Sequence, residues 1–351
     1  MSKNRWSYST KSDKRKFIAA MHIISLAVVI QLFIYEILPE ILYGAVYEFW
    51  ILYYDVFESE FFYLLPYDEI NYIIVNIVVI STAVAASLVT GIFIILCMKT
   101  FAAKSDNYNS IKVENKDKIS FKFVLPKNTF ALLAAGLCIV QFSVLIFNYI
   151  LYSVFGVPSH FETHTESYFP QTVLGIALYF ISVVIIPSLF EEFVFRYVML
   201  NSLKKYGNTF AIVVTSLLFG FAHARMSAFI FATAVGFFSA YIAIKTRSIW
   251  FPIILHAVVN GTSFLWQFLS ANPFIDDDII NILYFAFLSF ISAVTLIYLL
   301  TLIIKRRESR LAPPGNYIYI SKGRKAIFFF NGAALLFFIL AIARSLQDYI
   351  Y

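Results

Sequence analysis

Long runs of apolar residues, separated by short polar segments, make up most of the chain. A helix that crosses a bilayer needs about 20 predominantly apolar residues, within a range of about 17–25. Runs of this kind predict spans at 17–38, 72–98, 129–154, 172–200, 209–225, 227–244, 249–268, 280–304 and 326–346. The pattern therefore predicts an all-α fold, a polytopic membrane helical bundle with about nine transmembrane helices.

The positive charges fall on alternate connections between these spans. Of the 27 Lys and Arg residues, 24 lie in the segments 1–16, 99–128, 204–208, 245–248 and 305–325. The segments 39–71, 155–171 and 269–279 contain no Lys or Arg and are acidic. Because cytoplasmic loops carry an excess of Lys and Arg, this asymmetry predicts a cytoplasmic N-terminus and a C-terminus on the opposite side.

Composition supports a lipid environment. Hydrophobic residues make up 60% of the chain and charged residues 14%, against about 45–50% and about 25% in soluble domains. The net charge of +6 follows from the topology, so we expect the lipid bilayer as a partner and no nucleic acid. Cys97 and Cys138 lie in apolar runs without metal-ligand spacing, which favours small buried residues over a disulfide or a zinc ribbon.

The chain is predicted to contain three regions. Residues 1–165 would form an N-terminal three-helix membrane region, 166–270 a membrane core and 271–351 a C-terminal two-helix membrane region. The core is distinguished by ionisable residues within its spans. Such residues are costly in a bilayer and are functional-site hypotheses by default.

The first group is Glu191-Glu192-Phe-Val-Phe-Arg196. On a helix, Glu192 and Arg196 share a face and can pair, whereas Glu191 is turned by about 100° and points elsewhere. One carboxylate is thus structural and the other is free for chemistry. The alternative is that the cluster only marks the cytoplasmic end of a helix.

Two further groups lie on separate spans. Phe219-Gly-Phe-Ala-His223 contains one histidine in an apolar run, and His256-Ala-Val-Val-Asn260 places two polar side chains on one helix face. Each could simply make hydrogen bonds between helices. Counted at about 1.5 Å per residue, the three motifs can meet in one layer between the midplane and the cytoplasmic side.

In order and spacing, these motifs resemble those of the CPBP intramembrane proteases, which include CAAX prenyl proteases of the Rce type and bacterial Abi proteins. The resemblance covers about 172–268 and implies peptide-bond hydrolysis in a helical membrane fold, near the cytoplasmic side. It implies that Glu191 is the general base and that His223 holds the water. His256 and Asn260 would stabilise the oxyanion, and Glu192 and Arg196 would form a supporting pair.

A metal cofactor stays open at this point. Glu191, His223 and His256 could supply the three ligands of a catalytic zinc or another divalent metal, but the chain lacks HExxH and a metal-free glutamate mechanism has been argued for relatives. His160 and His164 form a second candidate pair, for which a solvated loop is the preferred interpretation.

The sequence thus predicts a multi-pass bacterial plasma-membrane endopeptidase that acts on a peptide or membrane-protein substrate. The alternative is a non-catalytic membrane scaffold, or a bacteriocin-immunity or cell-envelope regulatory protein of the same fold. A transporter is disfavoured because no paired spans are interrupted by Gly or Pro.

Overall fold

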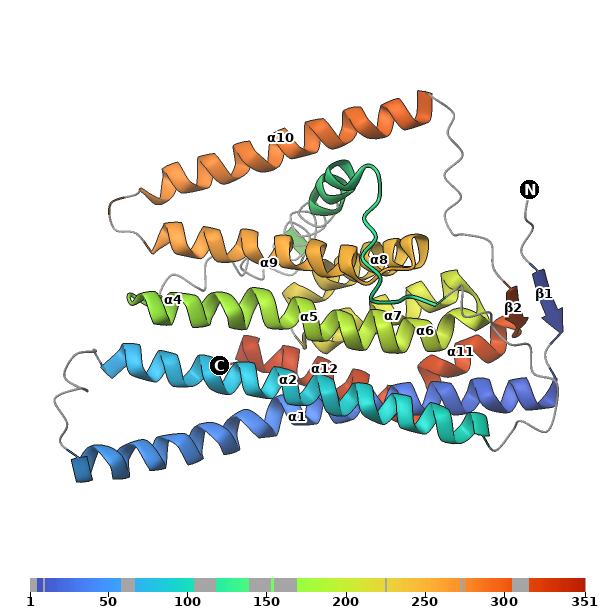
Figure 1. The fold of residues 1–351 in the computed structure, drawn as a ribbon, viewed down its shortest axis with the longest axis horizontal. Helices are drawn as coiled ribbons and strands as arrows, with labels where there is room; N and C mark the ends of the chain where they lie inside the picture. The colour runs from blue at the N-terminus through green and yellow to red at the C-terminus, as the bar shows by residue number, and fades with distance from the viewer. Residues whose placement is uncertain are drawn as a thin grey trace.

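A bundle of long helices forms the protein, and most of them lie roughly side by side along one direction (Figure 1). The computed structural model describes residues 5–8, 10–57, 67–103, 118–138, 153–154, 169–224, 226–271, 274, 276–304 and 316–350. The predicted all-α membrane bundle is confirmed, with one small two-stranded sheet as the exception.

The first two helices form a hairpin. Helix α1 (Lys11–Phe57) has 47 residues and α2 (Tyr67–Ala103) has 37. The prediction that 39–71 is a loop was wrong, because α1 continues through Pro39 to Phe57 and α2 begins at Tyr67. At about 1.5 Å per residue α1 is roughly 70 Å long, more than twice the hydrocarbon core of about 30 Å. Its acidic second half therefore extends beyond the bilayer.

The next helical rod contains the first motif. It consists of α4 (Val173–Phe180), the π-helical η3 (Ile181–Ile185), α5 (Ile186–Glu192), the π-helical η4 (Phe193–Leu200), the short α6 (Asn201–Leu203) and the 3₁₀ turn η5 (Lys204–Tyr206). The other two motifs lie on α7 (Asn208–Ala222) and its C-cap, and on α9 (Trp250–Ser270). Helix α8 (Met226–Thr246) connects them and packs against both.

The C-terminal part contains α10 (Asp277–Ile304), α11 (Lys322–Phe330) and α12 (Gly332–Ile350). Between α10 and α11, strand β2 (Asn316–Tyr319) pairs in parallel with strand β1 (Arg5–Tyr8), in the register Arg5 to Asn316. This two-stranded sheet was not predicted. It joins two segments that were both assigned to the cytoplasmic side.

The count of nine spans is not confirmed. Within the described residues, five helices are long and apolar enough to cross a membrane, or six if α11 and α12, bent by 52°, form one span. Three shorter apolar helices of 10–17 residues lie at Thr129–Cys138, Asn208–Ala222 and Asp278–Ile291. Part of the predicted span 129–154 lies outside the described residues. The division into three regions stays a prediction.

The predicted inside and outside segments lie at opposite ends of the bundle. At one end β1 pairs with β2, Lys325 Nζ donates to the Tyr206 carbonyl, and Ser120 bridges to Ser248. At the other end Glu69 accepts hydrogen bonds from the backbone N–H groups of Gln171 and Thr172. The helices thus run between two ends of unlike charge, as the Lys and Arg distribution requires.

Candidate active site

The rod that carries Glu191 and Glu192 is widened on both sides of them. The π-helical segments Ile181–Ile185 and Phe193–Leu200 flank α5 directly. Pro187 stands in the first turn of α5. It has no backbone N–H, so it cannot donate to the carbonyl of Val183 four residues earlier. Single-turn π-bulges often mark functional sites, and here they leave a backbone carbonyl available to another helix.

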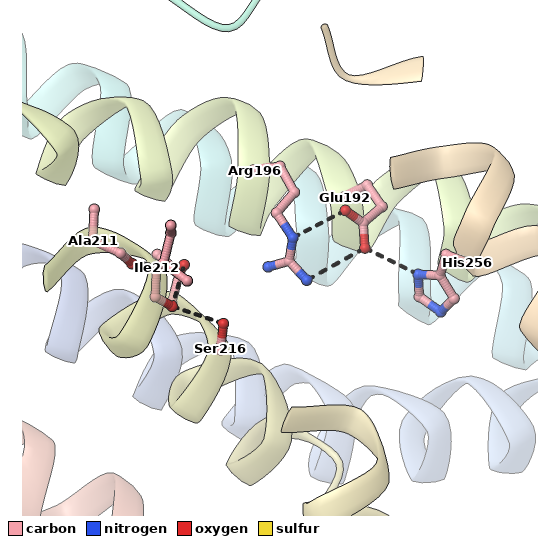
Figure 2. Close-up of polar contacts among 7 residues, drawn as sticks. Glu192, Arg196, Ala211, Ile212, Ser216 and His256 are labelled. Atoms are coloured by element: carbon pink, nitrogen blue, oxygen red, sulfur yellow. Dashed lines mark hydrogen bonds and ion pairs between the residues drawn. The ribbon is translucent and has the colours of Figure 1, made fainter. Parts of the chain in front are cut away.

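Glu192 is the centre of a buried charge network (Figure 2). Its side chain and that of Arg196 are both 0% exposed, and Arg196 Nε lies 3.1 Å from Glu192 Oε2. His256 Nδ1 lies 3.2 Å from Glu192 Oε1. The pairing of Glu192 with Arg196 expected from their spacing is therefore present, and α9 adds a third member.

Phe219 connects the three motifs. The Arg196 guanidinium carbon lies 4.8 Å from the centre of the Phe219 ring. The rings of His223 and His256 lie 4.9 Å and 5.7 Å from the same ring, both edge-on. A cation over an aromatic face and edge-to-face ring pairs are both favourable. The buried Phe219 ring therefore contacts the Arg196 guanidinium and both imidazole rings and keeps them apart.

His223 follows α7 as its C-cap residue. Its Nδ1 lies 2.8 Å from the carbonyl oxygen of Phe219. A carbonyl can only accept, so Nδ1 must carry the proton. In the neutral ring Nε2 then has a free lone pair. His223 is therefore ready to accept a hydrogen bond, for example from water.

Asn260 is tied to the rod rather than to another side chain. Its Nδ2 donates to the Val183 carbonyl over 2.9 Å. This is the carbonyl that Pro187 leaves without its usual helical donor. One amide N–H of Asn260 thus supplies the donor that the π-helical segment lacks. The second N–H and Oδ1 of Asn260 have no hydrogen bond within the described residues.

Glu191 has different surroundings from its neighbour. Its Oε2 atom is buried and has no hydrogen-bond partner in the described part of the chain. The residue as a whole is only partly buried. The two adjacent carboxylates therefore differ as their helix faces predict, with Glu192 held by two partners and Glu191 left open.

The expected metal ligands do not gather. His256 is turned to Glu192 rather than to Glu191, and His223 is turned to a carbonyl. Over the ranges that the structure describes, no group of three or more His, Cys, Asp or Glu side chains is placed to hold a metal ion. The set of Glu191, His223 and His256 does not form a three-ligand site here, and no reaction step is assigned to a metal. His160 and His164 lie outside the described residues.

Comparison with known proteins agrees with the motifs. A family model described as type II CAAX prenyl endopeptidase, Rce1-like, matches residues 172–262. YdiL of Bacillus subtilis (strain 168), named as a membrane peptidase, is 32% identical over 127 residues, or 36% of this chain. MroQ of Staphylococcus aureus (strain USA300), named a membrane-embedded CAAX protease, is 28% identical over 193 residues, covering 51% of this chain and 75% of MroQ. These matches support the CPBP family for residues 172–262. The chain is a multi-pass membrane protein.

The match to the CPBP model includes all six residues chosen from the sequence. The chain spans about half the length of YdiL, at 51%. No solved structure matches the chain. The helices α1 and α2 lie outside the matched residues, although α2 packs along α4, η3, α5 and η4.

A segment outside the CPBP match joins the ends of the two helical elements that carry Glu192 and His256. Asn201 Oδ1 accepts from the Ile119 N–H over 2.9 Å, and Asn201 Nδ2 donates to the Ile119 carbonyl over 3.0 Å. In the same segment, the Lys122 carbonyl accepts from Ser248 Oγ, and the Phe121 carbonyl accepts from Trp250 Nε1. We call 118–123 the clasp segment.

The sequence motifs did not assign roles to Phe219, Val183 or the clasp segment. Pro187 was the available signal for Val183, because a proline in a helix frees the carbonyl four residues before it. Phe219 lies within the second motif, but the chain has 39 phenylalanines, so the sequence does not single out this one. Asn201 gave no signal, since its partner is a distant backbone.

Proposed function

We propose that the protein is an intramembrane endopeptidase that hydrolyses a peptide bond with water activated by Glu191. The observation that carries this proposal is the contrast between the two adjacent glutamates. Glu192 forms an ion pair with Arg196 and contacts His256 Nδ1, while the buried Oε2 of Glu191 has neither an ion pair nor a hydrogen bond among the described residues. A carboxylate that is held in a site and free to accept a proton is what a general base requires.

In the proposed reaction, Glu191 takes a proton from water as the water oxygen bonds to the substrate's carbonyl carbon. The carbonyl electrons move to its oxygen, which gives a tetrahedral oxyanion. The proton then passes to the amide nitrogen as the C–N bond breaks, releasing a carboxyl group and an amine. Excluding bulk water strengthens each charge interaction in such a site.

The remaining polar groups have complementary roles in this proposal. With Nδ1 committed to the Phe219 carbonyl, His223 would use Nε2 to hold the attacking water. When doubly protonated, His256 would donate Nδ1–H to Glu192 and Nε2–H to the oxyanion. The second N–H of Asn260 is a further donor. Donors fixed before the reaction are worth most where charge develops.

Cleavage is proposed to occur between the bilayer midplane and the cytoplasmic side. The clasp segment lies at the end of the bundle where the predicted cytoplasmic segments meet. Glu192 is about 14 Å from Asn201 along its rod, and His256 is about 12 Å from Ser248 along α9, at 1.5 Å per residue. A peptide or membrane-protein substrate could therefore reach the site from the cytoplasmic interface. The names of the relatives, a membrane peptidase and a membrane-embedded CAAX protease, support peptide-bond cleavage.

The test compares membrane peptides from cells that express the wild-type chain, Glu191→Gln or Glu40→Gln. Glu40 is an exposed carboxylate on α1 and gives a matched control. We expect uncut precursors to accumulate only with Glu191→Gln, at equal protein levels. If no precursor accumulates, the protease proposal fails and a scaffold or regulatory role becomes the better explanation.

A further inference from the structure

Hydroxyl groups in these helices usually bond to the backbone one turn earlier. This is the common way to satisfy Ser and Thr in a membrane helix. Such donors to the carbonyl four residues earlier are Ser81, Thr100, Ser188, Ser202, Thr215, Ser216, Thr246 and Thr262. A buried hydroxyl that lacks this bond therefore stands out.

Three buried hydroxyls on α2 lack it, those of Thr82, Ser87 and Thr90. Ser87 and Thr90 are both 0% exposed and lie three residues apart on one helix face. Thr90 Oγ1 has no hydrogen-bond partner in the described part of the chain, and the group beside Ser87 Oγ is the Tyr35 hydroxyl. Leaving a buried polar atom unsatisfied is costly. In folded proteins such atoms are commonly completed by ordered water.

The packing of α2 places this pair beside the first motif. Ser182 Oγ donates to Asn76 Oδ1 over 2.6 Å, and a Cβ on Gly91 would lie 2.7 Å from the Phe193 ring. Helix α2 therefore runs parallel to the rod, with Asn76 beside Ser182 and Gly91 beside Phe193. Ser87 lies between these two contacts. It is consequently at the level of the rod segment that includes Glu191.

Helix α1 closes the same place from the other side. The Tyr35 side chain lies beside Ser87 and near Glu191. Gln31, one turn earlier on the same face, is 3% exposed and its Oε1 has no hydrogen-bond partner in the described residues. The open Oε2 of Glu191 completes the set. Unsatisfied oxygen atoms thus come from α1, α2 and α5.

We propose that Gln31, Tyr35, Ser87, Thr90 and Glu191 surround buried water, and that the water consumed in hydrolysis reaches Glu191 from this site. The supply role rests on the proposed function of Glu191. Water would accept from the Ser87 and Thr90 hydroxyls and donate to Gln31 Oε1 and Glu191 Oε2, which balances donors and acceptors. The helices outside the CPBP match would then contribute directly to the reaction.

The first test detects the water without using activity. Hydroxyl-radical footprinting of the wild-type chain in detergent produces radicals from bound water, which oxidise adjacent side chains. We expect oxidation at Tyr35 and none at Ile94, a 0% exposed residue further along α2. The double variant Ser87→Val with Thr90→Val should abolish the Tyr35 signal. Absence of oxidation at Tyr35, or a signal unchanged in the double variant, overturns the water site.

The second test is kinetic and uses a peptide identified by the precursor comparison. Ser87→Ala and Thr90→Val should each lower kcat by roughly 3- to 10-fold, the effect of one lost hydrogen bond, with KM unchanged. Ser81→Ala is the control, since its hydroxyl bonds to Ile77 within α2. A normal kcat in both variants, with footprinting still positive, overturns the supply role. If the protein cleaves nothing, the proposed function fails, and footprinting still decides whether the water is there.

Discussion

The rod that carries the first motif has two unlike sides. Towards α7 and α9, Glu192 is fully buried and bound by Arg196 and His256. Its neighbour Glu191, near Tyr35 of α1, has an oxygen with no partner among the described residues. Adjacent residues on a helix differ by about 100° in direction, so one step along the chain separates a structural carboxylate from a reactive one.

The difference shows how a charged site can be built in a bilayer. A buried carboxylate is tolerated when it is paired and hydrogen-bonded, and Glu192 meets that condition. A general base must instead stay free to take a proton. The cost of burying such a base is offset by its neighbours. For Glu191 these neighbours include the ion pair between Glu192 and Arg196.

The largest expected effect separates the two glutamates by stability. Glu192→Gln should lower the free energy of unfolding by about 3–5 kcal/mol, because it leaves the Arg196 charge buried and unpaired. Glu191→Gln should change it by about 1 kcal/mol or less, because no hydrogen bond is lost. Thermal unfolding of the purified proteins in detergent, followed by loss of helical signal, compares both. Equal destabilisation by the two variants would contradict the division of roles.

The motifs and the pairing could be predicted because they depend on local geometry. Glu192 and Arg196 are four residues apart, so helical spacing alone brings them together. The positions of the inside and outside segments followed from Lys and Arg. These signals need no knowledge of which helices touch.

Other features depend on contacts that no local pattern reveals. The extension of α1 beyond Pro39 was missed because hydropathy detects only helices that are apolar enough for lipid. An acidic helix outside the bilayer gives no such signal. The pairing of Arg5–Tyr8 with Asn316–Tyr319 joins segments from opposite ends of the chain. The bond from Asn260 to Val183 required knowing that α9 lies against the π-helical turn.

The next effect concerns Asn260. Its amide donates to the Val183 carbonyl of the rod and is also a proposed hydrogen-bond donor to the oxyanion. Asn260→Ala should lower kcat by about 10²–10³-fold if it is an oxyanion donor. It should also destabilise the protein, because the Val183 carbonyl loses its donor. Pro187→Ala supplies a backbone N–H that can reach the same carbonyl.

The double variant Pro187→Ala with Asn260→Ala separates these roles. We expect stability to recover and kcat to stay low, measured on the identified peptide. Recovery of kcat together with stability would show that Asn260 acts only by holding α9 against the rod. Pro187→Ala alone is the reference for both measurements.

A smaller effect is expected at the clasp segment. Asn201→Leu removes both hydrogen bonds to Ile119, and should cost about 1–3 kcal/mol at about 0.5–1.5 kcal/mol for each bond. Ser202→Ala is the control, because the Ser202 hydroxyl bonds only to Val198 on its own rod. Limited proteolysis near residues 118–123 should increase for Asn201→Leu. Equal protection in the two variants would mean that the clasp segment is held by its other bonds.

The smallest effect concerns Phe219, which lies between the two sides of the charge network. Phe219→Leu keeps an apolar side chain of similar size but removes the ring beneath Arg196 and beside both histidines. The loss of cation–π and edge-to-face contacts should cost about 1–2 kcal/mol. It should also lower kcat, since the histidines lose the ring that spaces them. Phe221→Leu is the matched control, because the Phe221 ring contacts Phe229 and Phe338 away from the motifs.

Both variants lose aromatic packing on the same helix, so both should inactivate at lower temperature. Only Phe219→Leu should slow turnover of the identified peptide once the two proteins are compared at a temperature where both are folded. If Phe221→Leu slows turnover equally, the slower turnover of Phe219→Leu results from a less stable α7 rather than from a specific role of the ring. If neither slows it, the positions of His223 and His256 are set by Glu192 and the Phe219 carbonyl alone, and the ring only fills space.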